Sequence, residues 1–414
     1  MTPAARQFHA WLDAANSDKL PGPGGPIKLA AFFKENCPWL PADHHLDLDL
    51  QYLRTGGIDL KHTGQDSETR YVGLIQDHAQ GLFRRVIIEV EPQDPWHLTR
   101  FDVELADAPP ELATPRLTEA DAIAASKQYL AEAEGNGTFS GTALVARRGE
   151  TVFTGAYGWQ DRDGGIRNSV GTRFRIASMG KMFTAVAVLQ LAQQGMLGLH
   201  DPISRYLPDY PDEEAAAKVT CHHLLSHSSG VCADVLRFWA GRRDQARPLR
   251  TLEDHMMALG VLGLEFEPGT QWAYTNFGYV LLGLIVQRVA GQDYYGYIRQ
   301  HVFTVVEMAS SGFEADAAGQ RDSVGYMRQP DSGELVAGRD GIAVAQASPS
   351  GGAFSTVEDI KRFADALTQY RLLDAEHYRL LTEGKIRAGT LGSFEAYGCE
   401  EFRANGVRLS LIHI

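Results

Sequence analysis

The sequence FRIASMGKMFTA occupies residues 174–185, and apolar residues continue at helical spacing as far as Gly195. Within this stretch, Ser178 and Lys181 are three residues apart, so that on a helix the hydroxyl and the amine share one face. The pattern predicts a helix from Ser178 to Gln194, with Gly195 as its C-terminal glycine. This helix would therefore carry a nucleophile and a proton acceptor at its start.

The two residues differ in how well an ordinary structural role explains them. Ser178 could simply cap the helix, because serine is preferred at the N-cap. Lys181 has no such explanation, since a cation in the first turn opposes the helix dipole. Burial and nearby positive potential would lower the pKa of this lysine, and the positive helix end would support an oxyanion on an attacked carbonyl.

A second short motif, Tyr274-Thr275-Asn276, follows a Pro268-Gly269 turn and opens another apolar helix. By chance this composition would give about 0.4 Ser-x-x-Lys and about 0.2 Tyr-x-Asn matches, so the motifs gain weight only as a pair. Tyr274 could be a core aromatic and Asn276 an N-cap. Alternatively, a phenol near a lysine ammonium ionises more readily and could take the proton from Ser178, while Asn276 could hydrogen-bond a substrate amide. The pair predicts acyl transfer through a covalent intermediate.

These residues resemble the serine β-lactamase and penicillin-binding-protein superfamily over about residues 136–405. Beside residues 174–185, the similar blocks are 199–208, 220–230, 267–269 with 274–276, and 350–359. Tyr-x-Asn in place of Ser-Asp-Asn makes the branch similar to class C β-lactamases, D-alanyl-D-alanine carboxypeptidases and related esterases. The resemblance implies an α/β fold in which helices and a central antiparallel sheet form an α+β sandwich.

The resemblance also implies roles for the site residues. Ser178 would be the acylated nucleophile, and Lys181 and Tyr274 would share the role of general base. Asn276 would orient the substrate, and the backbone N–H of Ser178 would form half of the oxyanion hole. We expect a serine hydrolase without cofactor or metal that acts on an ester, a β-lactam or a D-amino-acyl peptide. The alternative is a non-catalytic binding or regulatory protein on the same fold.

The chain divides into an accessory part, residues 1–107, a Pro-rich linker, 108–117, and a hydrolase domain, 118–408. The accessory part has an α+β pattern that resembles nuclear-transport-factor-2-like domains. Its expected helices are 2–16, 27–34 and 44–54, and its expected strands are 70–76, 83–91 and 96–104. The hydrolase domain opens with a helix at 119–133 and a hairpin that turns at 148–150.

The bulk properties exclude several partners. The 414 residues carry a net charge of −13, which disfavours nucleic acid and anionic membranes. No apolar run reaches about 18 residues, so no transmembrane helix is predicted. The N-terminal residues lack the basic and apolar regions of a signal peptide. We therefore expect a cytoplasmic protein, or a periplasmic or envelope-bound one if an upstream start is missing. The sequence does not predict an oligomeric state.

Rival chemistries lack their motifs. No Gly-x-Ser-x-Gly occurs, which argues against an α/β-hydrolase nucleophile elbow. His223 and His227 stand at i and i+4 with Cys221 nearby, but no glutamate completes a His-Glu-x-x-His metal site. The four cysteines show no Cys-x-x-Cys spacing; Cys221 and Cys232 could pair, although we expect reduced thiols.

The last six residues depart from the family pattern. A Lys-Thr-Gly or His-x-Gly motif, which supplies the second oxyanion N–H, should follow Arg408, yet residues 409–414 read LSLIHI. CTGTCTCTTATACACATC, a transposon-end adapter of sequencing libraries, encodes this hexapeptide. We therefore expect 409–414 to be non-native and the hydrolase domain to be incomplete. Such a chain would have an exposed sheet edge and lack one oxyanion donor, so we expect it to be poorly active or insoluble.

Overall fold

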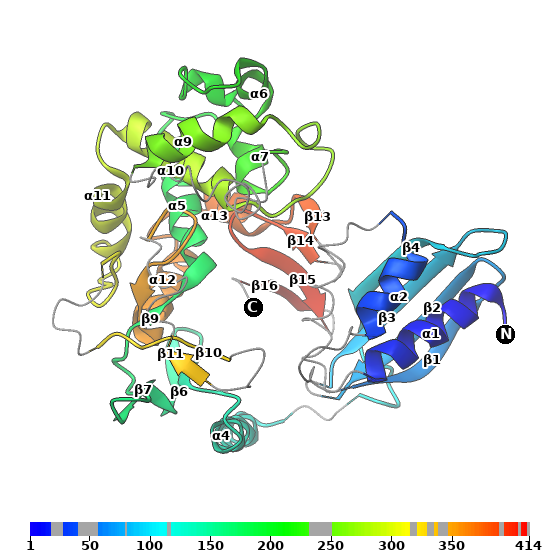
Figure 1. Cartoon of the computed structure of the whole chain (residues 1–414). Helices are drawn as coiled ribbons and strands as arrows, with labels where there is room; N and C mark the ends of the chain where they lie inside the picture. The colour runs from blue at the N-terminus through cyan, green and yellow to red at the C-terminus, as the bar shows by residue number, and fades with distance from the viewer. Residues whose placement is uncertain are drawn as a thin grey trace.

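The computed structural model describes residues 1–17, 28–39, 57–78, 81–113, 117–231, 251–314, 321–328, 335–337, 347–388, 393–404 and 407–411. Two groups of elements each enclose a hydrophobic core. The first group ends at residue 105 and lies beside the sheet that contains β13, β14, β15 and β16 (Figure 1).

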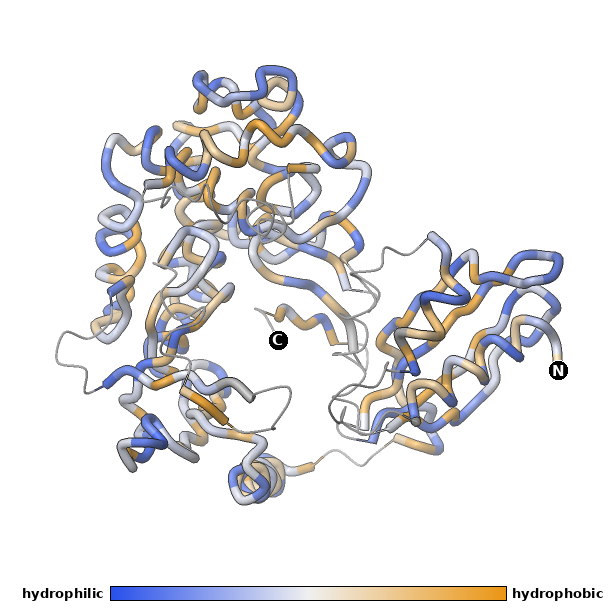
Figure 2. Tube along the Cα trace, in the orientation of Figure 1, coloured by the Kyte–Doolittle hydropathy of each residue, from blue (hydrophilic) through white to orange (hydrophobic). Residues whose placement is uncertain are grey.

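The N-terminal group is a four-stranded antiparallel sheet with two helices. The helices are α1 Pro3–Ser17 and α2 Lys28–Asn36, and the strands, in sheet order, are β1 Ile58–Asp66, β2 Arg70–Asp77, β3 Phe83–Val90 and β4 Leu98–Leu105. In Figure 2 the trace of both helices alternates between hydrophobic and hydrophilic positions, as expected of helices with one buried face. Aromatic rings fill the core: Trp11 and Phe33 both pack on Phe101, with ring centroids 5.5 and 5.0 Å away.

Most of the elements predicted for this group are confirmed. Thr2 caps α1 by accepting a hydrogen bond from the N–H of Ala5 at 3.2 Å. Strand β1 was not predicted, because this edge strand is polar and mostly exposed. Its pairing with β2 is also irregular at two places. The helix predicted at 44–54 lies outside the described residues.

The second group begins with α4 Glu119–Gly135 and the predicted hairpin. Strands β5 Gly141–Arg147 and β6 Glu150–Tyr157 pair antiparallel, with Arg147 opposite Glu150. The two turn residues, Arg148 and Gly149, both have positive φ, 54° and 84°, as a two-residue hairpin turn requires.

Two helices that are buried over most of their length form the centre of this group. They are α5 Lys181–Gln193 and α10 Asn276–Ala290, which pack against each other. Buried side chains occupy every side of both helices rather than one stripe, which is typical of a core helix. Residues 181–185, at the start of α5, therefore belong to the most enclosed part of the fold.

Shorter elements surround these two helices. The helical ones are η1 Ala177–Gly180, η2 Ile203–Arg205, α6 Glu213–Lys218, α7 Cys221–Leu225, α9 Leu252–Leu259, η4 Gly260–Leu262, α11 Tyr294–Ile298, η5 Arg299–Phe303, α12 Val357–Thr368 and α13 Ala375–Thr382. The short strands are β7 Trp159–Asp161, β8 Ile166–Arg167, β9 Phe174–Arg175, β10 Tyr326–Arg328, β11 Leu335–Ala337 and β12 Phe354–Ser355.

A second four-stranded antiparallel sheet closes the chain. Its strands are β13 Ile386–Ala388, β14 Ser393–Glu395, β15 Glu400–Ala404 and β16 Val407–Leu411, in that order. Helices with antiparallel strands agree with the predicted α/β class. No helix among the described residues is both long and apolar enough to cross a membrane.

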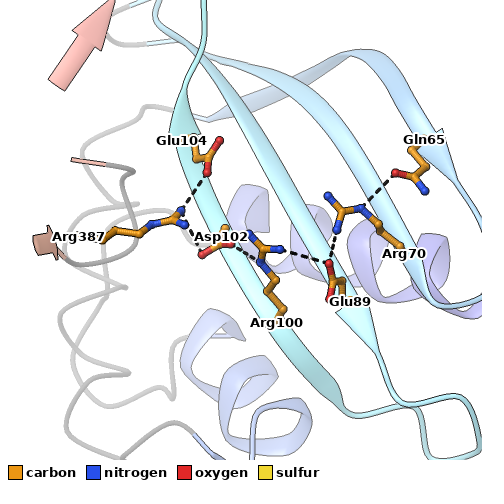
Figure 3. Close-up of polar contacts among 7 residues, drawn as sticks. All are labelled: Gln65, Arg70, Glu89, Arg100, Asp102, Glu104 and Arg387. Atoms are coloured by element: carbon orange, nitrogen blue, oxygen red, sulfur yellow. Dashed lines mark hydrogen bonds and ion pairs between the residues drawn. The ribbon is translucent and has the colours of Figure 1, made fainter. Parts of the chain in front are cut away.

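A row of alternating charges connects the two groups (Figure 3). Arg70, Glu89 and Arg100 lie opposite one another on β2, β3 and β4, so that each cation pairs with the carboxylate between them. On β4, Asp102 also pairs with Arg100. The row continues onto β13, where Arg387 donates to Glu104 at 2.9 Å and lies 3.4 Å from Asp102.

This contact predicts an effect on the linker. Arg387→Glu would place a third negative charge beside Asp102 and Glu104, and we expect the linker, residues 108–117, to be cleaved by a protease about two- to fivefold faster. The control Arg205→Glu disturbs an ion pair with Asp201 that lies inside the second group, and it should leave the cleavage rate unchanged. Equal rates for both variants would show that Arg387 does not hold the two groups together.

Candidate active site

Residues 174–177, which lead into Ser178, are hydrogen-bonded to residues 352–355. Strand β9 pairs with β12, and the N–H of Ile176 donates to the carbonyl of Ala353 at 2.8 Å. Ser178 lies in the 3-10 turn η1, and α5 begins at Lys181. The prediction of an α-helix that begins at Ser178 was therefore wrong, because the α-helix begins one turn later, at Lys181. Ser178 makes no capping hydrogen bond, so its position has no N-cap explanation.

Close backbone packing fixes the turn that carries Ser178. Ala177 has φ of 45°, a left-handed conformation that non-glycine residues rarely adopt, and its carbonyl accepts from the N–H of Gly352 at 3.0 Å. Gly351 has φ of 146°, and a Cβ added there would lie 2.4 Å from the carbonyl oxygen of Ala177 and 3.1 Å from Cα of Ser178. Only glycine allows this approach.

Lys181 is buried and yet makes three polar contacts. Its Nζ lies 2.7 Å from Oδ1 of Asn276, 2.7 Å from the carbonyl of Ser350 and 3.2 Å from Oγ of Ser178. The residue is 2% exposed, and this burial lowers its pKa to about 7 even though Glu395 acts in the opposite direction. The predicted depression of its pKa is thus confirmed, with desolvation as the main cause.

Tyr274 reaches the same serine from a loop. Its hydroxyl donates to Oγ of Ser178 at 2.7 Å, and Nζ of Lys181 lies 4.6 Å from the centroid of its ring. The expectation that this phenol ionises readily was wrong. Burial raises the pKa of Tyr274, and this outweighs its hydrogen bond with Ser178, which acts in the opposite direction. With its pKa lowered to about 7, Lys181 also offers less positive charge to favour a phenolate than an ordinary lysine would.

Asn276 is the first residue of α10, and the helix is capped by its neighbour. The side chain of Thr275 accepts from the N–H of Gly278, so Asn276 is not the N-cap. Its Oδ1 instead accepts from Lys181. The structure therefore brings all four predicted residues, Ser178, Lys181, Tyr274 and Asn276, into one hydrogen-bonded cluster.

His227 adjoins the site, although in the sequence it stood out only as part of a possible metal face that lacked its glutamate. Its ring lies on that of Tyr274 with centroids 4.5 Å apart, and its Nδ1 accepts from the N–H of Thr275 at 3.1 Å. Burial, with a smaller effect of Lys181, holds its pKa well below the usual range, so the ring is neutral. His227 thus supports the loop that presents Tyr274.

The other members of the possible metal face have different surroundings. His223 closes the first turn of α7 with Thr220, and burial lowers its pKa. Cys221 is a buried free thiol, and burial raises its pKa to about 12. In the part of the chain that the structure describes, no group of three or more His, Cys, Asp or Glu residues could hold a metal ion.

Glu395, on β14, was not singled out from the sequence. It is 4% exposed, and burial raises its pKa to about 8. Its Oε2 accepts from Nε1 of Trp272 at 3.2 Å, two residues before Tyr274. No local motif marks this residue, because only the fold brings β14 to the start of α5.

The packing at Gly351 predicts the behaviour of a small substitution. Gly351→Ala should displace the carbonyl of Ala177, and with it Ser178, and we expect the rate of Ser178 modification by a fluorophosphonate to fall about 10- to 100-fold. At the control position, Gly325→Ala, an added Cβ would meet no atom within 4 Å. Circular dichroism checks that both variants are folded. A wild-type rate in a folded Gly351→Ala variant would contradict the role given to this glycine.

Known proteins resemble this chain in sequence. PbpX of Bacillus subtilis (strain 168) is 29% identical over 262 residues, which are 63% of this chain and 63% of PbpX. Protein flp of Staphylococcus aureus (strain MW2) is 32% identical over 189 residues, 45% of this chain and 37% of flp. This chain thus spans less than two thirds of either curated relative.

Solved structures resemble the chain as well. The penicillin-binding protein of Bacillus halodurans superposes with a TM-score of 0.60 at 30% identity, over 68% of this chain and 84% of that one. A D-amino acid amidase from Ochrobactrum anthropi SV3 superposes with a TM-score of 0.53 at 27% identity, over 65% and 79% of the two chains. The sequence pattern of the Beta-lactamase family matches residues 127–400, which include all four clustered residues, and the chain belongs to this family.

Proposed function

We propose that this chain is a serine hydrolase that forms an acyl-enzyme on Ser178. One observation carries the proposal: Oγ of Ser178 lies between two groups able to manage its proton, Nζ of Lys181 at 3.2 Å and the hydroxyl of Tyr274 at 2.7 Å. A nucleophile within hydrogen-bond reach of a base that is itself oriented by further contacts is typical of covalent catalysis.

The contacts of Lys181 support its role as the general base. A neutral amine has two N–H donors and one lone pair. The two short contacts, to Asn276 and to the carbonyl of Ser350, use both donors, because each partner atom is an acceptor. The lone pair is then left for Ser178, whose hydroxyl donates to it. With its pKa near 7, Lys181 is substantially neutral at neutral pH.

Tyr274 acts as a proton donor in this scheme. Its hydroxyl donates to Oγ of Ser178, which gives a chain of hydrogen bonds from Tyr274 through Ser178 to Lys181. As Oγ attacks the carbonyl carbon, its proton passes to Lys181 and the carbonyl oxygen gains the charge. The tetrahedral intermediate then expels the leaving group, which takes a proton from Tyr274, and Lys181 returns one to Tyr274. Water releases the acyl group by the same proton transfers in reverse.

The proposed substrates are an ester, a β-lactam or a D-amino-acyl peptide. The likeness to a penicillin-binding protein and to a D-amino acid amidase supports this range, since all these compounds present a carbonyl to a serine. Asn276 would contact the substrate amide, while its Oδ1 continues to hold Lys181. Hydrolysis of nitrocefin, p-nitrophenyl acetate and D-alanyl-D-alanine peptides distinguishes the three classes.

Labelling of one serine tests the proposal. Fluorophosphonate should modify Ser178, as located by peptide mass spectrometry, and Ser178→Ala should abolish the label. Lys181→Met should slow labelling about 100-fold or more, because Ser178 loses its proton acceptor. The control Ser126→Ala removes an exposed hydroxyl on α4 and should label like the wild type. Each variant is compared with the wild-type chain, so a low absolute labelling rate does not affect the comparison. Labelling that survives in Ser178→Ala would overturn the proposal.

A further inference from the structure

Glu395 lies where the C-terminal sheet meets the start of α5. On β14 its register partners are Ile386 and Glu400. The turn after this strand approaches α5 so closely that a Cβ on Gly398 would lie 3.2 Å from the carbonyl oxygen of Lys181. A carboxyl group that is 4% exposed, in a region packed against the catalytic lysine, is costly to bury and therefore calls for a role.

The carboxyl group is connected to the loop that carries Tyr274. Oε2 of Glu395 accepts from Nε1 of Trp272 at 3.2 Å. The next residue, Ala273, donates its N–H to the carbonyl of His227 at 2.9 Å, and the His227 ring lies on Tyr274. The loop is thus held by His227 on one side and by Glu395, through Trp272, on the other.

The charge of Glu395 also matters for Lys181. Burial, with a contribution from Glu400, raises the pKa of Glu395 to about 8, against smaller effects of Trp272 and Lys181. At neutral pH the carboxyl group is therefore mostly protonated and places little negative charge near the amine. Once ionised, it raises the pKa of Lys181 and of Tyr274. An ionised carboxylate here therefore favours the charged form of Lys181, which must lose its proton before it can accept one from Ser178.

Other titratable groups face Glu395 from each element around it. They are Lys181 of α5, Tyr274 of the loop, Tyr279 of α10, Cys399 of the turn and Glu400 of β15. Burial raises the pKa of Tyr274, Tyr279 and Cys399, so these three keep their protons between pH 6 and pH 9. In that range the buried groups that change charge are Lys181 and Glu395.

We propose that Glu395 is a positioning residue of the active site: it accepts a hydrogen bond from Trp272 and through it holds Tyr274 against Ser178, and its carboxylate favours the charged form of Lys181. This inference rests on the proposed function, because it concerns the same serine and lysine. It assigns the placement of Tyr274, and part of the pH dependence of Lys181, to a carboxyl group that does not itself touch the reacting atoms.

The test measures the fluorophosphonate labelling rate from pH 6 to pH 9. In the wild type the rate should rise with pH as Lys181 loses its proton near pH 7. Glu395→Gln keeps an acceptor for Trp272 but cannot ionise. Its rate at pH 7 should stay within about threefold of the wild type, and the rise should occur at a lower pH, because no carboxylate then favours the charged form of Lys181.

Two further variants test the positioning itself. Glu395→Leu keeps the volume without the acceptor, and Trp272→Phe removes the N–H; both should lower the maximal labelling rate about 10- to 100-fold, while the probe concentration at half-maximal rate stays unchanged. Glu395→Leu exchanges a buried carboxyl for an apolar group, so it should melt no lower than the wild type. The control Glu383→Gln changes an exposed carboxyl before β13 and should behave like the wild type.

The outcomes separate this inference from the proposed function. A wild type that never labels at Ser178 contradicts the hydrolase itself. A wild type that labels, with a rise in rate at the same pH in Glu395→Gln, contradicts the electrostatic role. Wild-type maximal rates in folded Glu395→Leu and Trp272→Phe contradict the positioning role.

Discussion

Removal of the Lys181 amine from water is the constraint on which the rest of the site depends. An ammonium ion at this position would lose its hydration, and the carboxyl group that acts on it, Glu395, is itself mostly protonated at neutral pH. The amine therefore gives up its proton near neutrality. This desolvation makes a lysine, whose amine is ordinarily charged, able to accept a proton from Ser178.

The fold excludes water from the Lys181 amine and fixes its position. Lys181 begins a helix whose neighbours are core residues, so it cannot turn towards solvent. Residues 350–352 pack closely against the turn at Ala177 and Ser178, which the glycine at position 351 allows. This packing also brings the carbonyl of Ser350 to the Lys181 amine. The start of α10 supplies Asn276, and the loop before it supplies Tyr274. Each contact comes from a different part of the chain, and the close backbone approaches leave little room for adjustment.

The sequence predicted the parts of this site that are written in local patterns. Ser178, Lys181, Tyr274 and Asn276 stand in short motifs beside apolar helices, and these motifs are readable without a structure. The polar edge strand β1 was missed because it lacks alternating hydrophobic residues. His227 and Glu395 were not recognised as parts of the site because their roles depend on contacts across the fold, with Tyr274 and Trp272. The protonation of Tyr274 was predicted in the wrong direction, since its burial is a tertiary property.

The most direct test of the account is the pKa of the Lys181 amine itself. The protein can be labelled with ¹⁵N-lysine and the side-chain nitrogen signals followed by NMR between pH 5 and pH 11, with Lys181→Met to assign the signal. The account predicts that one lysine titrates near pH 7 and that its signal is missing in the variant. Titration of the Lys181 signal near its ordinary value of 10.5 would show that the amine is charged at neutral pH, and would contradict its role as the base.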